Sequence, residues 1–127
     1  MKLFFDGACR PNPGNMQVAV IAAGRTYHKP ELGYGTSEEA EWLALLYALE
    51  IASTLGRSDV QLLGDSASVI NQALGRTKCR SPEVQRHLAA FADRAKQFSR
   101  LRIRHVKRTQ NLAGIALQKL SDCPFHT

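Results

Sequence analysis

The sequence predicts an α/β domain in which an antiparallel meander of strands leads into parallel strands, with helices packed beside the sheet. Three observations predict it. Short apolar runs near the start are separated by a turn rich in Pro, Asn and Gly, as in a meander. A long segment after Thr36 has helical spacing. The apolar run 59–64 follows that helix, and a strand reached by a helical crossover is expected to lie parallel to the first strand.

Five strands are expected, in an order that gives a mixed sheet. The first, 2–7, is the apolar run Leu3-Phe4-Phe5 closed by an acid and a glycine, and the breaker-rich turn 10–15 follows it. The second, 17–23, is a run of Val, Ile and Ala, and a shorter third strand is expected within 25–35. The remaining two strands are expected at 59–64 and 101–107.

Helices are predicted from their start and stop signals. Thr36 and Glu39 have the spacing of a capping box, and Gly56 stops the helix that follows at about residue 55. A second helix is expected over 66–74, ended by Gly75. Pro82 suits the first position of a third helix, which runs to about residue 98. A last helix is expected over 110–120.

Size and composition indicate one soluble domain over residues 1–127. The chain is 44% hydrophobic, and no apolar stretch approaches the roughly 20 residues that span a bilayer, so no membrane partner is expected. The three cysteines, Cys9, Cys79 and Cys123, are odd in number and widely spaced. They are typical of free thiols in a reducing compartment, which predicts a cytoplasmic location.

Charge is distributed unevenly along the chain. The formal net charge is +6, yet residues 1–75 carry 5 Lys/Arg against 8 Asp/Glu, and residues 76–127 carry 12 against 3. An acidic focus beside a basic surface suits a polyanion that is bound through its phosphates. The alternative is a basic face that only aids solubility.

Two acids stand where predicted strands end. Asp6 closes the first strand, and Asp65 follows the strand 59–64. The carboxyl ends of neighbouring parallel strands are where α/β sheets place ligands. Each acid also has a purely structural interpretation, because Asp6 could be a turn residue and Asp65 could cap the next helix.

A third acid, Glu41, lies on a predicted buried helix face. It shares the core-facing stripe with Leu45, Ala48, Leu49 and Ala52, at helical spacing. By contrast, Glu38 and Glu39 are expected to be first-turn acids that only favour the helix dipole. A carboxylate beside core residues is costly unless it binds a cation or hydrogen-bond donors, so the three acids together predict a divalent metal site.

At this point the chain resembles a known family. Segment 6–14 reads D-G-A-C-R-P-N-P-G and is similar to the D-G-x-x-x-x-N-P-G opening of type 1 ribonuclease H. Segment 40–45, A-E-W-L-A-L, resembles the family's A-E-x-x-A-L helix, and 64–66, G-D-S, its D-S strand end. Segment 78–83 resembles the linker of the short prokaryotic form. The likeness runs from residue 2 to about residue 120.

The resemblance implies a ribonuclease H-like fold, with a mixed five-stranded sheet flanked by helices, and hydrolysis of the RNA strand of RNA–DNA hybrids. It implies two Mg²⁺ ions about 4 Å apart, which activate water and stabilise the leaving 3′ oxygen. Asp6 would bridge both ions, Glu41 and Asp65 would each hold one, and the Gly7 backbone would assist. Asn12 would help to read the RNA 2′-hydroxyl. The other expected nucleic-acid contacts are Ser37, Arg76, Lys78, Arg80, Lys107, Arg108 and Asn111.

The chain departs from the family pattern at three places. The family's last helix usually reads N-x-x-A-D, and its Asp is a fourth metal-site acid, but Ile115 stands at that position here. The family commonly has paired Asn residues where this chain has Ser37 and Glu38, and Glu38 would face phosphate unfavourably. The loop 106–111 has no His, and His105 falls inside the expected last strand, where a structural role is more common.

Three functional hypotheses follow. The first is a weakened or Mn²⁺-preferring ribonuclease H that uses Asp6, Glu41 and Asp65 with Mg²⁺ or Mn²⁺. The second is a catalytically inactive relative that binds nucleic acid or a protein partner through the same fold. The third is an unrelated phosphate-binding α/β domain. The sequence names no protein partner and is compatible with a monomer or a weak dimer, in which Trp42 and Tyr47 are considered as contact residues.

Overall fold

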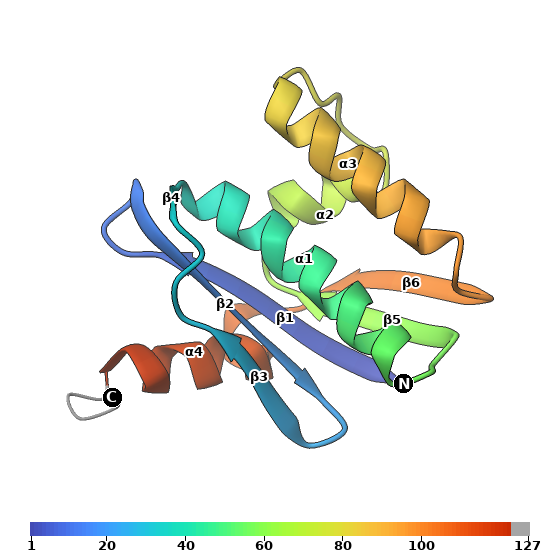
Figure 1. Ribbon diagram of the computed structural model, residues 1–127, viewed down its shortest axis with the longest axis horizontal. Coiled ribbons are helices and arrows are strands. Elements are labelled where there is room, and N and C mark those ends of the chain that lie inside the picture. Colours follow the sequence, from blue (N-terminus) through green and yellow to red (C-terminus); the bar gives the residue numbers. More distant parts are fainter. Residues whose placement is uncertain (123–127) are drawn as a thin grey trace.

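A mixed β-sheet with helices on both faces forms the frame of the molecule in the computed structural model, which describes residues 1–122 and the side chains of residues 1–120 (Figure 1). The strands are β1 (Lys2–Cys9), β2 (Gly14–Ala22), β3 (Arg25–Lys29), β4 (Tyr34–Gly35), β5 (Asp59–Gly64) and β6 (Arg100–His105). The helices are α1 (Ser37–Thr54), α2 (Ala67–Ala73), α3 (Pro82–Ala95) and α4 (Leu112–Asp122), with a 3₁₀ turn at Arg108–Gln110. Among the described residues, no helix is both long enough and apolar enough to cross a bilayer.

The strand order β3-β2-β1-β5-β6 confirms the predicted combination of an antiparallel meander with parallel strands. β2 runs antiparallel to β1 and β3, whereas β5 is parallel to both β1 and β6. Leu3 pairs with Leu62, which pairs in turn with Ile103. The carboxyl ends of β1, β5 and β6 therefore point toward the same edge of the sheet.

Element boundaries differ from the expectation where pairing between distant residues decides them. β1 runs on to Cys9, because Cys9 still pairs with Met16 of β2. The prediction that Asp6 closes this strand is therefore wrong, since Asp6 lies inside it and pairs with Ala19. The stretch 25–35 forms β3 and the two-residue β4, which pairs with the start of β2. β6 ends at His105 and not at residue 107, because Lys107 already accepts a 2.8 Å hydrogen bond from the Gln110 amide in the 3₁₀ turn.

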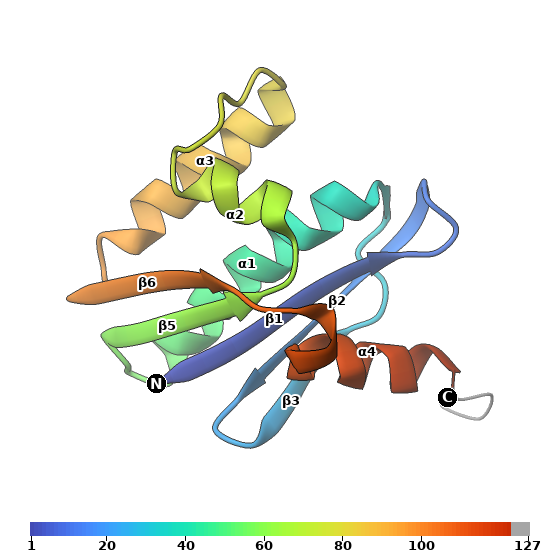
Figure 2. The same cartoon turned by 180° about the vertical axis from the view of Figure 1, so that it is seen from behind.

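α1 lies in the core between the sheet and α3 (Figure 1). Its predicted apolar stripe is confirmed, because Leu45, Ala48, Leu49 and Ala52 are all buried. The predicted cap is also present: the Thr36 hydroxyl accepts a hydrogen bond from the Glu39 amide. α4 packs on the opposite face, against β1, β2 and β3, as Figure 2 shows from behind.

The sequence-based idea of Trp42 as a contact residue between two chains is wrong. Trp42 is 0% exposed, and its indole N–H donates a 2.8 Å hydrogen bond to the Gln72 side chain of α2. Its ring stacks on His87 and meets Phe91 of α3 edge-on. Trp42 therefore joins three helices on one face of the sheet, and Tyr47 is only partly exposed.

Candidate metal centre and catalytic groove

Three acids converge at the carboxyl edge of the sheet. One carboxylate oxygen each from Asp6, Glu41 and Asp65 lies within 4.8 Å of the others. Asp6 comes from β1, Glu41 from α1, and Asp65 directly follows β5. The predicted convergence of these side chains is confirmed, although they are separated by up to 59 positions in the sequence.

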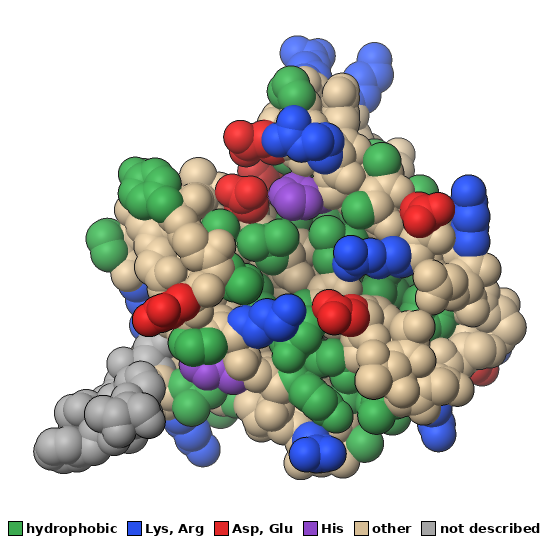
Figure 3. All heavy atoms as spheres, viewed as in Figure 1, with side chains coloured by type: hydrophobic (Ala, Val, Ile, Leu, Met, Phe, Trp, Pro, Cys, Tyr) green, Lys and Arg blue, Asp and Glu red, His purple; other side chains and the backbone are tan. Residues whose placement is uncertain are grey.

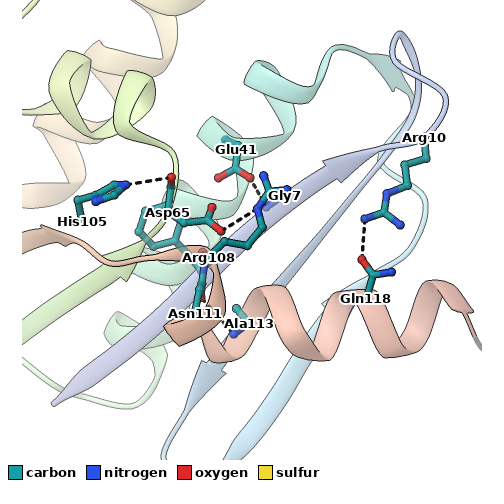
Figure 4. A network of polar contacts seen from close by, with 10 residues as sticks. Gly7, Arg10, Glu41, Asp65, His105, Arg108, Asn111, Ala113 and Gln118 are labelled. Atoms are coloured by element: carbon teal, nitrogen blue, oxygen red, sulfur yellow. Dashed lines mark hydrogen bonds and ion pairs between the residues drawn. The ribbon is translucent and has the colours of Figure 1, made fainter.

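Close packing of α1 on β1 brings Glu41 to the cluster. A Cβ atom at Gly7 would overlap the backbone carbonyl of Ala40, so only glycine permits this approach. The Gly7 amide then donates a 3.1 Å hydrogen bond to Glu41 Oε1 (Figure 4). This bond fixes Oε1 of the Glu41 carboxyl group and does not involve Oε2.

The second oxygen of Glu41 has no hydrogen-bond partner among the described residues. Glu41 is only 9% exposed, and its Oε2 atom is buried without a hydrogen-bond partner. Burial, followed by the nearby charge of Asp6, raises the pKa of the Glu41 carboxyl well above its usual value. Burial also raises the pKa of Asp6 from 3.8 to about 6, and the charge of Asp65 adds to that effect. Anionic oxygens held together in this way fit a divalent cation, which would neutralise them and occupy the orphaned oxygen.

Asp65 is free to face this cluster because a neighbour caps the following helix. The Ser66 hydroxyl accepts a hydrogen bond from the Val69 amide and is the N-cap of α2. The capping role considered for Asp65 is therefore wrong. The Asp65 carboxylate lies 3.5 Å from Arg108 Nε, and its backbone carbonyl lies 3.2 Å from His105 Nε2 (Figure 4).

α4 closes the cluster from the opposite face of the sheet. Asn111 is fully buried, its amide group donates a 3.0 Å hydrogen bond to the Phe5 carbonyl, and its oxygen accepts one from the Ala113 amide. Asn111 was expected to contact nucleic acid; that expectation is wrong, because both of its polar groups are used inside the protein. The next turn places Gly114 against Asp6, where an added Cβ would lie 3.5 Å from Asp6 Oδ2.

The acids lie in a groove of about 850 Å³. Basic side chains on its walls come from three separate segments: Arg10, Arg108 and Lys119. Sequence reasoning missed Arg10 and Lys119, because nothing in their local pattern indicates that they face the acids. Arg10 is held there by a 2.9 Å hydrogen bond to the Gln118 side chain of α4. The groove thus combines an acidic floor with a basic rim.

Glu38 also lines the groove, but its carboxylate is tied to α2. Its Oε1 atom accepts hydrogen bonds from the Ser68 hydroxyl at 2.9 Å and the Gln72 amide at 3.1 Å. Glu38 is therefore more than the helix-start acid that was expected. It links the first turn of α1 to α2, while Trp42 secures the same Gln72 side chain.

Asn12 and Ser37 form a reciprocal pair at one end of this region. The Asn12 amide donates to the Ser37 hydroxyl at 2.9 Å, and the Ser37 amide donates to Asn12 Oδ1 at 3.1 Å. These bonds join the turn after β1 to the start of α1. Both residues were predicted nucleic-acid contacts, and of the two Ser37 lines the groove.

The other predicted basic contacts divide into two groups. Arg108 lines the groove, and Lys107 lies exposed just before it. Arg76, Lys78 and Arg80 are exposed on the loop between α2 and α3 and do not line the groove. Lys and Arg side chains project from the end of the molecule where α3 begins (Figure 3).

Ile115, the residue at the expected fourth-acid position, lies on α4 and lines the same groove as the three acids. It is 39% exposed. Its neighbour Gly114 approaches Asp6.

Comparison with known proteins agrees with this geometry. The family model described as reverse transcriptase-like matches residues 4–121. The ribonuclease HI of Halobacterium salinarum is 34% identical over 119 residues, which cover 90% of this chain and 60% of that protein. The crystal structure of RNase H1 from that organism is 31% identical, with a TM-score of 0.85, over 96% of this chain and 98% of the other.

The chain belongs to the ribonuclease H-like family. LC11-RNase H1, whose structure was solved in complex with an RNA/DNA hybrid, shares the fold at 24% identity and a TM-score of 0.78, over 91% of each chain. This ribonuclease H-like chain spans 60% of the length of the Halobacterium protein. The family assignment agrees with the fold.

Proposed function

We propose that this chain is a divalent-metal-dependent endonuclease that hydrolyses the RNA strand of RNA–DNA hybrids. The observation that carries the proposal is the cluster of Asp6, Glu41 and Asp65, whose ligand atoms lie within 4.8 Å of one another in a groove with a basic rim. Family membership supports the same activity and a dependence on divalent metal ions.

The carboxylates of Asp6, Glu41 and Asp65 would hold the metal ions, assisted by the backbone of Gly7. Bound Mg²⁺ or Mn²⁺ would supply Lewis-acid activation of water and stabilisation of the leaving 3′ oxygen. The Gly7 amide orients Glu41 so that its second oxygen remains free for a cation. Asp6 interacts with both Glu41 and Asp65 and would hold the metal ions together with them.

The groove's basic residues would position the substrate. Arg108 has a side chain that is 90% exposed, so it can reach a phosphate while remaining near Asp65. Arg10 and Lys119 offer further phosphate contacts along the rim. Asn12 and Ser37 would contact the RNA 2′-hydroxyl groups, with recognition by shape and sugar rather than by base sequence. Arg76, Lys78, Arg80 and Lys107 would contact phosphates beyond the groove.

We further propose that Ile115 takes the place of the fourth acid and weakens the enzyme or shifts its preference to Mn²⁺. An apolar side chain at the metal centre supplies no ligand and no charge against two dications. The same substitution is the basis of the alternative, an inactive binding module. We expect the protein to act in the cytoplasm, as a monomer or a weak dimer.

A cleavage assay tests the proposal. A labelled RNA–DNA hybrid is incubated with the protein in Mg²⁺ and, separately, in Mn²⁺. Cleavage of the RNA strand that Asp6→Asn abolishes supports the nuclease. Asp93→Asn, which removes an exposed acid from α3, is the matched control and should cleave like the wild type. Hybrid binding without cleavage in either ion would favour the inactive module.

A further inference from the structure

In the part of the chain that the structure describes, β5 and β6 carry a row of cations on the sheet face that α4 shares, and no helix covers them there (Figure 2). α4 packs on β1, β2 and β3, and Figure 2 shows β5 and β6 lying beyond it. On β6, Leu101 and Ile103 pack against the core on the α1 side. Since side chains alternate along a strand, Arg100, Arg102 and Arg104 face the opposite way, and all three are exposed.

The pairing of the strands extends this row across the sheet. Arg102 pairs with Gln61 of β5, and Gln61 pairs with Lys2 of β1. Lys2 is exposed and faces the same side, because its neighbour Leu3 is in the core. We call these four residues, Lys2, Arg100, Arg102 and Arg104, the basic sheet face. Asp59 lies 3.5 Å from Arg102 and offsets part of its charge.

Protection of an edge strand is the simplest explanation for charges on β6, because charged side chains discourage pairing with another chain. Edge protection, however, does not require that the charges at all three outward positions of β6 be positive. It also does not explain Lys2, which is on the inner strand β1. The row also leads to the groove: β6 ends at His105, which contacts Asp65, and the chain continues through Lys107 to Arg108. The basic sheet face is therefore continuous with the site of the proposed function.

We propose that the basic sheet face binds the phosphates of a single strand of nucleic acid that continues past the end of the hybrid in the groove. The inference adds a second binding surface to the proposed function and does not require cleavage. From Arg100 to Arg104 the row is about 13 Å long at ~3.3 Å per residue. Three arginines along this length offer one contact each to three phosphates of an unpaired strand.

A single strand suits this position better than a continuing duplex. The groove opens at the carboxyl edge of the strands, whereas the basic sheet face lies on the flat side of the sheet. A polynucleotide that contacts both must change direction within a few nucleotides. Duplex DNA resists such bending, with a persistence length of about 150 base pairs, whereas an unpaired strand turns freely.

Binding measurements in EDTA test the inference without any cleavage. The probes are a fluorescent blunt hybrid, the same hybrid with an RNA tail of about 8 nucleotides, and the tail by itself. We expect the wild type to bind the tailed hybrid about tenfold more tightly than the blunt one at ~50 mM salt. The triple variant Arg100→Gln, Arg102→Gln, Arg104→Gln should bind both hybrids equally. Its salt dependence for the tailed probe should fall by about 2 in log–log slope, at ~0.7 per lost phosphate contact.

Two matched variants distinguish the effect of positive charge on the basic sheet face from the effect of a lower net charge and from the effect of replacing arginine itself. Arg25 lies on β3 at the opposite edge of the sheet, and Arg86 and Lys96 lie on α3 and at its end, on the α1 side. All three are exposed, and changing all three to Gln should leave the tail preference intact. Replacing the three β6 arginines by Lys should also preserve it, because the charge remains. Thermal unfolding checks that every variant is folded.

The other outcomes overturn the inference. If the triple Gln variant keeps the tail preference, or the wild type has none, the basic sheet face does not bind a single strand. If the triple variant loses affinity for the blunt hybrid equally, the face contacts duplex instead. Failure of the proposed nuclease function gives a different result, in which no RNA strand is cut in Mg²⁺ or Mn²⁺ while the tail still binds.

Discussion

Asp6 is held where its negative charge destabilises the fold in the absence of metal. It lies among Glu41, Asp65 and the backbone of α4, and its pKa is raised from 3.8 to about 6. A carboxyl group whose pKa is higher in the folded state binds more protons there than in the unfolded chain. Stability therefore falls as the pH rises through the interval between about 4 and about 6, and the loss persists at higher pH.

We expect Asp6→Asn to abolish cleavage and yet to stabilise the metal-free protein. At about pH 8 the gain should be about 2–3 kcal/mol, because each unit of pKa shift corresponds to ~1.4 kcal/mol. The measurement is urea unfolding in EDTA at about pH 8 and about pH 4. At the lower pH the difference between the two proteins should nearly vanish, since Asp6 is protonated in the folded wild type. An equal difference at both pH values would contradict this account.

Ile115 offers a test of the fourth-acid position. We expect Ile115→Asp to raise Mg²⁺-dependent cleavage about tenfold or more, because a carboxylate there would add a ligand beside Asp6. Leu112→Asp is the matched control: Leu112 is also an exposed apolar residue of α4, 47% exposed, but it does not line the groove. Steady-state cleavage rates in Mg²⁺ and Mn²⁺ give the comparison. If Ile115→Asp folds and gains no more than Leu112→Asp, Ile115 does not lie beside the metal ions.

At the scale of elements, the site depends on how two helices are attached to β1. α1 packs closely on β1 at Gly7. α4 is attached through Asn111, the residue just before it, whose side chain donates a hydrogen bond to the Phe5 carbonyl and accepts one from the Ala113 amide at the start of α4. These attachments bring Glu41 and Gly114 to opposite sides of Asp6. Small changes at either attachment therefore affect both stability and the groove.

We expect Asn111→Ala to destabilise the protein by about 2–3 kcal/mol, because it removes two buried hydrogen bonds and leaves the Phe5 carbonyl without its partner. Asn15→Ala is the matched control. The Asn15 side chain is exposed and donates one hydrogen bond, to the Pro30 carbonyl, so its loss should cost less than about 1 kcal/mol. Free energies of unfolding in urea measure both. Equal effects of the two substitutions would show that Asn111 does not anchor α4.

Across the whole molecule, the fold separates acidic from basic side chains more completely than their order in the sequence does. The net charge is +6, yet the centre of the groove is acidic and cations surround it. A polyanion is attracted to such a surface, while metal ions are attracted to its centre. Cation binding should therefore stabilise the folded state and not the unfolded chain, in which the three acids are far apart.

We expect Mn²⁺ or Mg²⁺ to raise the melting temperature of the wild type in a concentration-dependent way. At about 100 times the Kd, binding to the native state contributes ~2.7 kcal/mol. Asp65→Asn should lose most of this shift, and Asp93→Asn should keep it. Differential scanning fluorimetry across a metal titration provides the measurement. A shift of equal size in all three proteins would indicate that the cation binds outside the acid cluster.

The sequence by itself determined the local features and their order. Caps, glycine stops and apolar periodicity predicted the helices and strands. The expected placement of Asp6 and Asp65 at strand ends, with Glu41 on a buried stripe, predicted one acid cluster, although Asp6 lies inside β1. These signals are local, or they follow from the topology of parallel strands.

Only the tertiary structure decided what the remaining side chains do. It buried Asn111 and Trp42, tied Glu38 to α2, and brought Arg10 and Lys119 to the groove. Within residues 1–122 it also left one face of β5 and β6 uncovered by any helix, so that alternate arginines of β6 form a basic surface. Each of these outcomes depends on contacts between residues far apart in the chain, and no spacing within a single element encodes which distant partner a side chain will meet.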